Sequence, residues 1–231
     1  MGLFDLFKPD VGKLQKQRDI QGLMTALEHK DTQIRAHAAY SLGELKALSS
    51  VDVLINHLRD DENDVKRESA LALGNIRNQK AIPVLIETFR YGINWDPQYG
   101  TTDAYMNPVS VSGGLRDTYV SIHNNAKWAL LQIGVPAIPA LVNTLSDRSP
   151  YARLHACNVI GNMKEKTLVS SIAKLLEDPF HFVRHSAAWS LGSIGDSASL
   201  NNLKIAYQKE SDERVKKEIR KSIESIENKG T

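Results

Sequence analysis

A twelve-residue pattern occurs six times along the chain, and this repetition constrains the fold more than any other feature of the sequence. Each copy begins with an aliphatic or small residue, position zero, and most copies place small side chains at positions +4 and +5. The sixth copy departs from this pattern, with Ile219, Arg220 and Glu224 at positions that are usually small. The copies are IRAHAAYSLGEL (34–45), VKRESALALGNI (65–76), IHNNAKWALLQI (122–133), ARLHACNVIGNM (152–163), VRHSAAWSLGSI (183–194) and VKKEIRKSIESI (215–226). Their starts are 31, 57, 30, 31 and 32 residues apart, which predicts a stack of similar units.

Each unit is expected to be a pair of helices. In the second helix, apolar or small residues recur at 0, +4, +8 and +11, as in Ile34, Ala38, Leu42 and Leu45. At 100° per residue these positions form one buried stripe. An apolar stretch with helical spacing precedes each copy and predicts the first helix of the pair. We therefore expect an all-α chain with a short N-terminal cap (1–14) and a repeat domain (15–231).

The single long interval indicates an insertion in the third unit, at about residues 92–117. The surrounding segment, 91–119, holds four of the seven tyrosines and no lysine. Loops of this length are usually functional or disordered, and disordered segments contain few aromatic residues. We expect the insertion to fold over a strip of the following helix, formed by His123, Lys127 and Leu131, and to border a binding groove there.

Composition excludes several classes of protein. The net charge of +2 and the scattered basic residues do not indicate nucleic-acid binding. Cys157 is the only cysteine, so no disulfide framework is possible, and a reducing, cytoplasmic location is expected. No apolar run is long enough to span a membrane. Leu3, Phe4, Leu6 and Phe7 are interpreted as a hydrophobic cap on the first unit, and the alternative is weak peripheral membrane contact through residues 1–7.

The motif V-R-x-x-A-A-x-A-L-G-x-I with a period near 31 resembles the HEAT-like repeat of the phycobilisome-lyase type. VRHSAAWSLGSIGD (183–196) matches it almost throughout, and the resemblance covers about residues 15–226 without the insertion. It implies a right-handed α-α superhelix, or α-solenoid, of about six helix pairs. The same repeat occurs in bilin lyase subunits, in a di-iron hydroxylase and in proteins that only bind partners, so it is specific for fold and weak for function.

The resemblance also implies a structural ladder between basic and acidic residues. The basic residues stand at +1, and the acidic residues stand in the turns before the second helices. The expected members are Arg35, Lys66, Arg153, Arg184 and Lys216, with Asp31, Asp61, Asp147, Asp178 and Asp212. The alternative is that the basic column forms a binding groove.

Positions +2, +3 and +6 lie opposite the buried stripe, and the family uses them, together with −2 and −1, to line its concave surface. Carried over residue by residue, this surface is aromatic and rich in histidine and asparagine, a composition typical of binding sites. The predicted partner-binding residues, including three from the insertion, are Tyr40, Arg67, Asn124, Trp128, Tyr151, His155, Asn158, Phe182, His185, Trp189, Trp95, Tyr99 and Tyr105. The alternative is that these rings fold down onto neighbouring helices.

The sequence favours a non-catalytic scaffold that binds a protein or peptide partner, with no cofactor. The family's di-iron ligands are His-Glu pairs, and this chain contains no His-Glu dipeptide. A metal site formed by His155, His181 and His185 lacks a carboxylate at a matching spacing, so no metal is expected. The alternative function is that of a bilin lyase-like or chromophore-handling protein, in which groove aromatics and Asp96 and Asp103 hold a tetrapyrrole.

Overall fold

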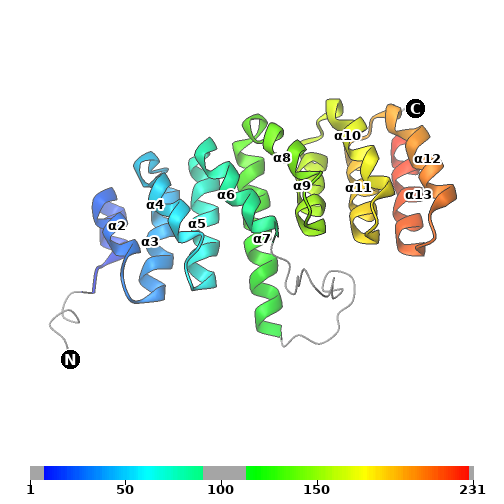
Figure 1. The fold of residues 1–231 in the computed structure, drawn as a ribbon. Coiled ribbons are helices and arrows are strands. Elements are labelled where there is room, and N and C mark those ends of the chain that lie inside the picture. Colours follow the sequence, from blue (N-terminus) through cyan, green and yellow to red (C-terminus); the bar gives the residue numbers. More distant parts are fainter. Residues whose placement is uncertain (1–7, 91–112, 229–231) are drawn as a thin grey trace. The chain divides into compact units, whose positions relative to one another are not determined.

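The structure is a computed structural model that describes residues 8–90 and 113–228, with only the backbone for 113–121. It confirms the all-α fold, because these residues form thirteen α-helices and short 3₁₀ turns without any strand (Figure 1). The α-helices are α1 (Val11–Gln17), α2 (Ile20–Leu27), α3 (Thr32–Glu44), α4 (Val51–His57), α5 (Asn63–Ile76), α6 (Ile82–Glu87), α7 (Gly113–Ile133), α8 (Ile138–Thr144), α9 (Pro150–Met163), α10 (Val169–Ala173), α11 (His181–Ile194), α12 (Leu200–Lys209) and α13 (Glu213–Glu227). The 3₁₀ turns are η2 (Leu48–Ser50), η3 (Gln79–Ala81), η4 (Thr88–Arg90), η5 (Val135–Ala137), η6 (Lys166–Leu168), η7 (Lys174–Glu177) and η8 (Ser197–Ser199).

The helices divide into two compact units. Unit 1 comprises Met1–Leu85 and Gly114–Ile133, and unit 2 comprises Ile86–Gly113 and Gly134–Thr231. In unit 1 the first helices α2 and α4 pack on the second helices α3 and α5. In unit 2 the pairs are α8–α9, α10–α11 and α12–α13. Each pair contains one of the twelve-residue repeats in its second helix.

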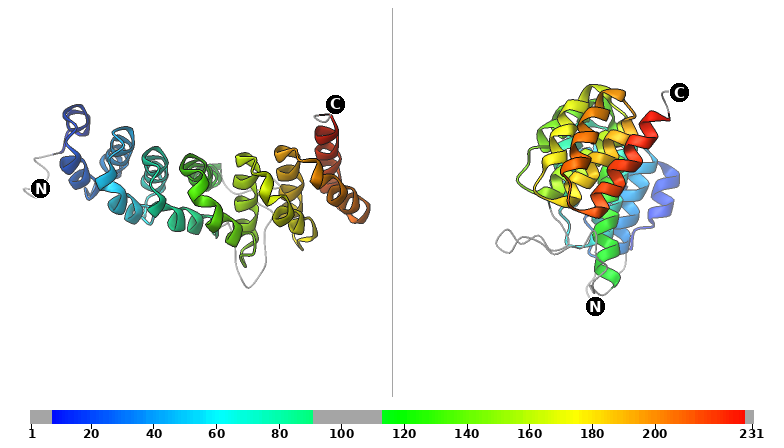
Figure 2. Two further views of the ribbon diagram at one scale, coloured as in Figure 1. Left: turned by 90° about the horizontal axis from the view of Figure 1, so that it is seen from above. Right: turned by 90° about the vertical axis from the view of Figure 1, so that its right-hand side faces the viewer.

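Second helices pack closely because glycine stands at position +9. In unit 1 a Cβ atom on Gly43 would lie 2.6 Å from Ala72 Cα, and one on Gly74 would lie 2.8 Å from Ala129 Cα. Helices α3, α5 and α7 therefore lie side by side, as Figure 1 and the left view of Figure 2 show. Any larger side chain at these glycines would push neighbouring helices apart.

Unit 2 uses the same close approach and adds serine hydrogen bonds. A Cβ atom on Gly161 would lie 2.7 Å from Ser190 Cβ. The Ser190 hydroxyl donates to the carbonyl of Cys157 at 2.9 Å, and the Ser222 hydroxyl donates to the carbonyl of Ala188 at 2.9 Å. These bonds join α9 to α11 and α11 to α13, and they satisfy hydroxyl groups that are buried between the helices.

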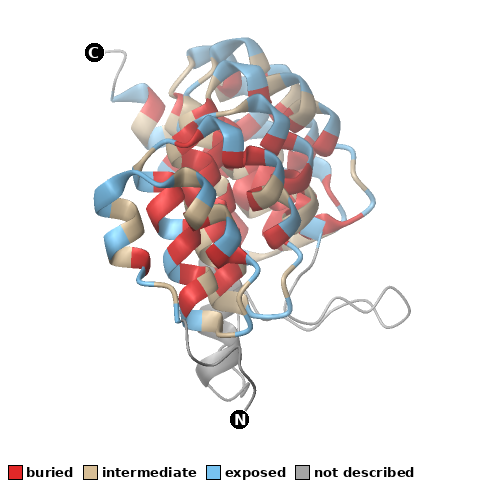
Figure 3. Cartoon of the chain, turned by 90° about the vertical axis from the view of Figure 1, so that its left-hand side faces the viewer, coloured by how far each residue is buried: buried red, intermediate tan, exposed pale blue. Residues whose placement is uncertain are grey.

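The buried residues lie on the parts of the helices that are turned toward other helices (Figure 3). Of the predicted stripe in the first copy, Ile34, Ala38 and Leu42 are buried and Leu45 is partly buried. Cys157 at +5 is fully buried, and burial raises the pKa of its thiol to about 11. The small-residue positions of the pattern are therefore packing positions, as the periodicity predicts.

Helix α7 begins earlier than the third copy of the pattern. It runs from Gly113 to Ile133, so residues 113–117, which were assigned to the insertion, are helical. No proline or glycine interrupts the sequence between residues 115 and 133, so nothing local ends the helix within that range. The remainder of the predicted insertion lies outside the described residues, together with Trp95, Tyr99 and Tyr105.

Candidate partner-binding face

The turns that present the second helices are held by arginine–carboxylate pairs. Arg35 Nε and Nη2 donate to Asp60 Oδ2 and Oδ1, both at 3.0 Å, and Arg35 Nη1 donates to the carbonyls of His29 (2.9 Å) and Lys30 (3.1 Å). In unit 2, Arg153 makes the same two-pronged contact with Asp178 at 2.7 and 2.9 Å. Bidentate pairs of this kind neutralise the buried charges and fix the orientation of the two side chains. They therefore support the interpretation that these arginines form a structural ladder.

The carboxylate of each pair stands five residues before position zero of the next repeat, which corrects two of the sequence expectations. Asp60, not Asp61, accepts from Arg35, and Glu210, not Asp212, accepts from Arg184 at 2.7 and 2.8 Å. The reason is the geometry of the turn, because a carboxylate at −5 also accepts a hydrogen bond from the backbone N–H of the residue at −3. Asp60 accepts from Glu62 in this way, and Glu210 accepts from Asp212. Asp212 instead pairs with Arg214 in its own turn at 2.8 Å.

The arginine–carboxylate ladder changes at the third helix pair, where the insertion interrupts the repeat. His123 occupies the +1 position of α7, and Asp147 is paired with Arg90 from η4 at 2.9 Å. The carbonyl of Arg90 also accepts from the Ser149 hydroxyl at 3.2 Å. The turn before α9 is therefore held by a residue from the end of a first helix, within unit 2. At Lys66 and Lys216 the contacts are local, with Asn63 (3.5 Å) and Glu213 (3.1 Å).

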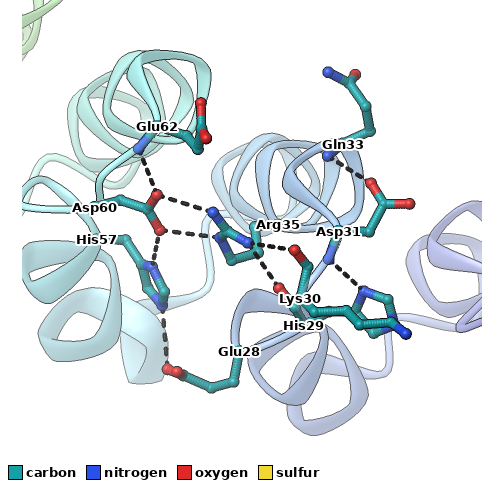
Figure 4. Close-up of polar contacts among 9 residues, drawn as sticks. All are labelled: Glu28, His29, Lys30, Asp31, Gln33, Arg35, His57, Asp60 and Glu62. Atoms are coloured by element: carbon teal, nitrogen blue, oxygen red, sulfur yellow. Dashed lines mark hydrogen bonds and ion pairs between the residues drawn. The ribbon is translucent and has the colours of Figure 1, made fainter. Parts of the chain in front are cut away.

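In unit 1 the Arg35–Asp60 pair belongs to a larger polar cluster (Figure 4). His57, which is largely buried, lies between two carboxylates, with Nδ1 3.3 Å from Asp60 Oδ2 and Nε2 3.1 Å from Glu28 Oε1. Glu28 caps the end of α2, and His57 ends α4. The cluster thus links the first helices of two successive pairs.

The face of unit 1 opposite its packed stripe carries four of the predicted partner-binding residues. Tyr40 is 45% exposed and lies beside His37, with ring centroids 6.5 Å apart. Asn124 is exposed, while Arg67 and Trp128 are half-buried. Sequence register alone predicts this placement, because +2 and +6 lie away from the buried stripe.

Most polar groups on this face are already held in place. Arg67 lies between Asp64 Oδ1 (3.0 Å) and Glu68 Oε1 (3.2 Å). The Asn125 amide donates to the carbonyl of Arg67 at 3.2 Å and joins α7 to α5. Trp128 packs its ring over Gly74. The face of unit 1 therefore carries polar groups of α5 and α7 that neighbouring residues hold in place, together with the exposed Tyr40 ring of α3.

In unit 2 three of the predicted binding residues are buried. Tyr151, His155 and Phe182 are 2%, 0% and 7% exposed. The Tyr151 and Phe182 rings stack with centroids 5.4 Å apart, and His155 lies 5.2 Å from Phe89. This packing matches the alternative in which rings fold onto neighbouring helices, and a binding role for these three residues stays a prediction.

Sequence reasoning did not identify the partners of these rings. Phe89 and Phe180 both lie outside the twelve-residue pattern, in the turns that precede second helices. The ring centroids of Phe180 and Phe182 are 5.5 Å apart, and Arg153 Cζ lies 5.8 Å from the centroid of the Phe180 ring. The D-P-F-H-F segment, with Phe180 just before α11 and Phe182 in the first turn of that helix, is the sequence signal from which this cluster could be predicted.

The other predicted residues of unit 2 are half-buried. Asn158 accepts from the Ser186 hydroxyl at 2.5 Å. His185 lies 3.8 Å from Glu218, and burial lowers the pKa of its imidazole despite the opposing effect of that carboxylate. Trp189 is half-buried on the same helix, α11. These residues together form the second-helix face of unit 2.

A groove of about 560 Å³ lies elsewhere on unit 2, between the α10–η7 segment and α12. Its lining includes Ala173, Leu176, Arg184 and Ile205, of which Ile205 is 43% exposed. This groove lies on the first-helix side and contains none of the predicted partner-binding residues.

The described parts of the chain contain no group of three or more histidine, cysteine, aspartate or glutamate residues arranged to hold a metal ion. Among the same residues, no helix has both the length and the apolar character needed to cross a membrane.

Comparison with known families explains the repeat. The family of HEAT repeats matches residues 20–104 and 138–224, which together exceed half of the 231-residue chain. The match spans helix pairs in both units, so it accounts for the pattern on which the fold prediction was based.

Two curated relatives match parts of the chain. An uncharacterized protein in the gldA 3' region of Geobacillus stearothermophilus is 39% identical over 80 residues, which is 34% of this chain and 37% of the relative. Epoxyqueuosine reductase of Bacillus subtilis (strain 168) is 35% identical over 84 residues, 36% of this chain and 22% of that enzyme. The chain thus spans about a third and about a fifth of these relatives, too little to transfer an activity.

Solved structures support the fold. A Kap121p mutant matches with a TM-score of 0.66 and 14% identity, over 93% of this chain and 26% of that one. A chain from a structure on microtubule plus end tracking by XMAP215, CLIP-170 and EB1 matches with a TM-score of 0.58 and 15% identity, over 88% and 89%. An archaeal HEAT-like repeats protein from Thermococcus onnurineus NA1 matches with a TM-score of 0.51 and 14% identity, over 94% and 91%. At these identities the similarity concerns the fold alone.

Proposed function

Because the chain belongs to the HEAT repeat family, we propose that it is a non-catalytic scaffold that binds a protein or peptide partner on its second-helix faces. The observation that carries the proposal is the Tyr40 ring, which is 45% exposed on a face where Arg67 and Asn125 are held by neighbouring residues. Tyrosine and tryptophan add contact area at little cost in conformational entropy and are enriched in the energetic centres of interfaces. Ordered neighbours lower the entropy lost on binding.

We extend the proposal to the insertion, which we expect to border the face of unit 1 beside Trp128. Support comes from the aromatic composition of the segment and from two residues of α7. His123 is 2% exposed, and burial lowers the pKa of the half-buried Lys127. Replacing residues 92–111 by a short Gly-Ser linker should weaken partner binding and increase the exposure of α7. Unchanged partner binding and unchanged hydrogen exchange in α7 would contradict this extension.

The proposal is tested by affinity capture from an extract of the native cell with the full chain as bait. Tyr40→Ala should reduce recovery of the captured partner by about tenfold, the effect typical of an aromatic anchor. Leu48→Ala is the matched control, because Leu48 is 66% exposed but lies in η2, away from the second-helix faces. Capture that is equal for wild type and Tyr40→Ala, or lost in Leu48→Ala, would place the binding surface elsewhere.

A further inference from the structure

Two lysines of α13 are exposed on the second-helix face of unit 2 and are not neutralised by an ion pair within the described residues. Lys217 and Lys221 stand at +2 and +6, one turn apart, and both are exposed. Neither makes an ion pair with any residue that the structure describes. Other basic residues of the helix are occupied: Arg214 by Asp212 at 2.8 Å, Lys216 by Glu213 at 3.1 Å and Arg220 by the Tyr207 hydroxyl at 2.6 Å.

The lysines adjoin the aromatic part of the face. The bond from the Ser222 hydroxyl to the Ala188 carbonyl (2.9 Å) brings the turn that contains Lys221 against the turn that contains Trp189. Helices α11 and α13 also lie side by side in Figures 1 and 2. A half-buried indole and two exposed ammonium groups therefore belong to one surface, which we call the α11–α13 face (His185, Trp189, Lys217 and Lys221).

The acidic side chain nearest to the two lysines in sequence faces inward. Glu218 lies between the two lysines in sequence, but its side chain is only 13% exposed and lies 3.8 Å from His185 Nε2. Its charge is directed toward α11. Glu224, one turn after Lys221, is exposed, so the outward charges on this part of α13 are two lysines and one glutamate, and their sum is positive. In unit 1 the arginine at the corresponding +2 position, Arg67, is already paired with Asp64 and Glu68.

We propose that the α11–α13 face binds an acidic peptide segment, with carboxylates on Lys217 and Lys221 and an adjacent apolar side chain on Trp189. The inference rests on the proposed function and names the partner class for unit 2. Charges at the rim of an interface select partners by sign and make binding dependent on salt. Two exposed ion pairs together account for about a tenfold change in affinity.

The test is a selection from a random peptide display library on the immobilised full chain, run in parallel with two double variants. Lys217→Glu/Lys221→Glu reverses the two charges of the face. Lys166→Glu/Lys174→Glu is the matched control, because it makes the same change in net charge at two exposed lysines of η6 and η7. Circular dichroism of all three proteins checks that they are equally folded.

Wild type and the control should both enrich aspartate and glutamate next to an apolar residue, and the face variant should lose this preference or enrich lysine and arginine. A peptide selected by the wild type should bind the face variant about tenfold more weakly, with the wild-type affinity falling as salt is raised. An acidic preference that survives in the face variant, or that is lost in the control, would overturn the inference.

The extract capture separates this inference from the proposed function. If the wild type selects no peptide while Tyr40-dependent capture succeeds, the scaffold function stands and the acidic-peptide inference is overturned. If neither peptide selection nor capture yields a partner, the proposed function itself is overturned.

Discussion

The same arginine–carboxylate pair occurs in two different surroundings in this protein. In unit 1 the Arg35–Asp60 pair is flanked by His57, which also contacts Glu28 (Figure 4). In unit 2 Arg153, paired with Asp178, lies over the Phe180 ring, which leads to Phe182 and Tyr151. The repeat therefore fixes the pair and its register, whereas side chains outside the repeat decide whether its surroundings are polar or aromatic.

The difference in surroundings should determine what each pair contributes to stability. A buried carboxylate that loses its only cationic partner keeps its full desolvation cost, and the cost is larger where no other polar group replaces the lost contact. The Asp178 side chain is 4% exposed and that of Asp60 is 9% exposed. We therefore expect unit 2 to depend more strongly on its arginine than unit 1 does.

The largest expected effect is that of removing Arg153. Arg153→Met should lower the free energy of unfolding by about 3–4 kcal/mol, because Asp178 is left buried without its cation. Arg35→Met should cost less, about 1–2 kcal/mol, because His57 remains beside Asp60. Urea denaturation followed by circular dichroism measures both, and equal losses would show that the surroundings do not matter.

The next effect concerns the aromatic residues. Phe182→Ala should lower the free energy of unfolding by about 3 kcal/mol, because a buried ring leaves a cavity. Tyr40→Ala, the matched change on the exposed face of unit 1, should change stability by no more than about 0.5 kcal/mol. Denaturant unfolding of the two variants checks this, and a large loss in Tyr40→Ala would mean that Tyr40 has a packing role.

A third prediction concerns pH and the second pair of unit 2. Hydrogen bonds from Arg184 lower the pKa of Glu210 below its usual 4.5, despite the opposing effect of burial. A carboxylate with a lowered folded pKa stabilises the protein above its unfolded pKa, and this contribution is lost as pH falls through the folded value. Glu210→Gln should therefore destabilise the protein by about 1–3 kcal/mol at pH 7. The difference from wild type should shrink at pH values below 4.5, and a pH-independent difference would contradict the assignment.

The smallest expected change in stability comes from glycine substitutions at helix ends, and it should be the same in both units. Lys164 and Arg77 end α9 and α5 in the left-handed conformation, with φ of 55° and 59°. Gly195 occupies the same position after α11 with φ of 72°. Lys164→Gly and Arg77→Gly should each raise stability by up to about 1 kcal/mol, because glycine adopts this conformation without strain. Thermal unfolding measures the change, and destabilisation by glycine would show that these basic side chains favour the helix ends by more than the strain costs.

The fold could be predicted from the sequence because its determinants are local and recur. Apolar residues at 0, +4, +8 and +11 define one face of a helix, and the repetition of that face every 31 residues requires neighbouring units to cover it. None of these conclusions needed knowledge of residues distant in the sequence.

Tertiary structure decided the features that depend on how turns bring distant side chains together. Asp60 and Asp61 are indistinguishable by charge, and only the turn geometry places the first within reach of Arg35. Tyr151 and Phe182 stand at positions where the family exposes side chains, yet both are buried, because their rings stack on each other and Phe180 lies beside Phe182. The period of a helix specifies the direction in which each side chain leaves the helix axis. Whether that side chain is buried depends on which other elements lie in that direction, and the sequence of a single helix does not specify those elements.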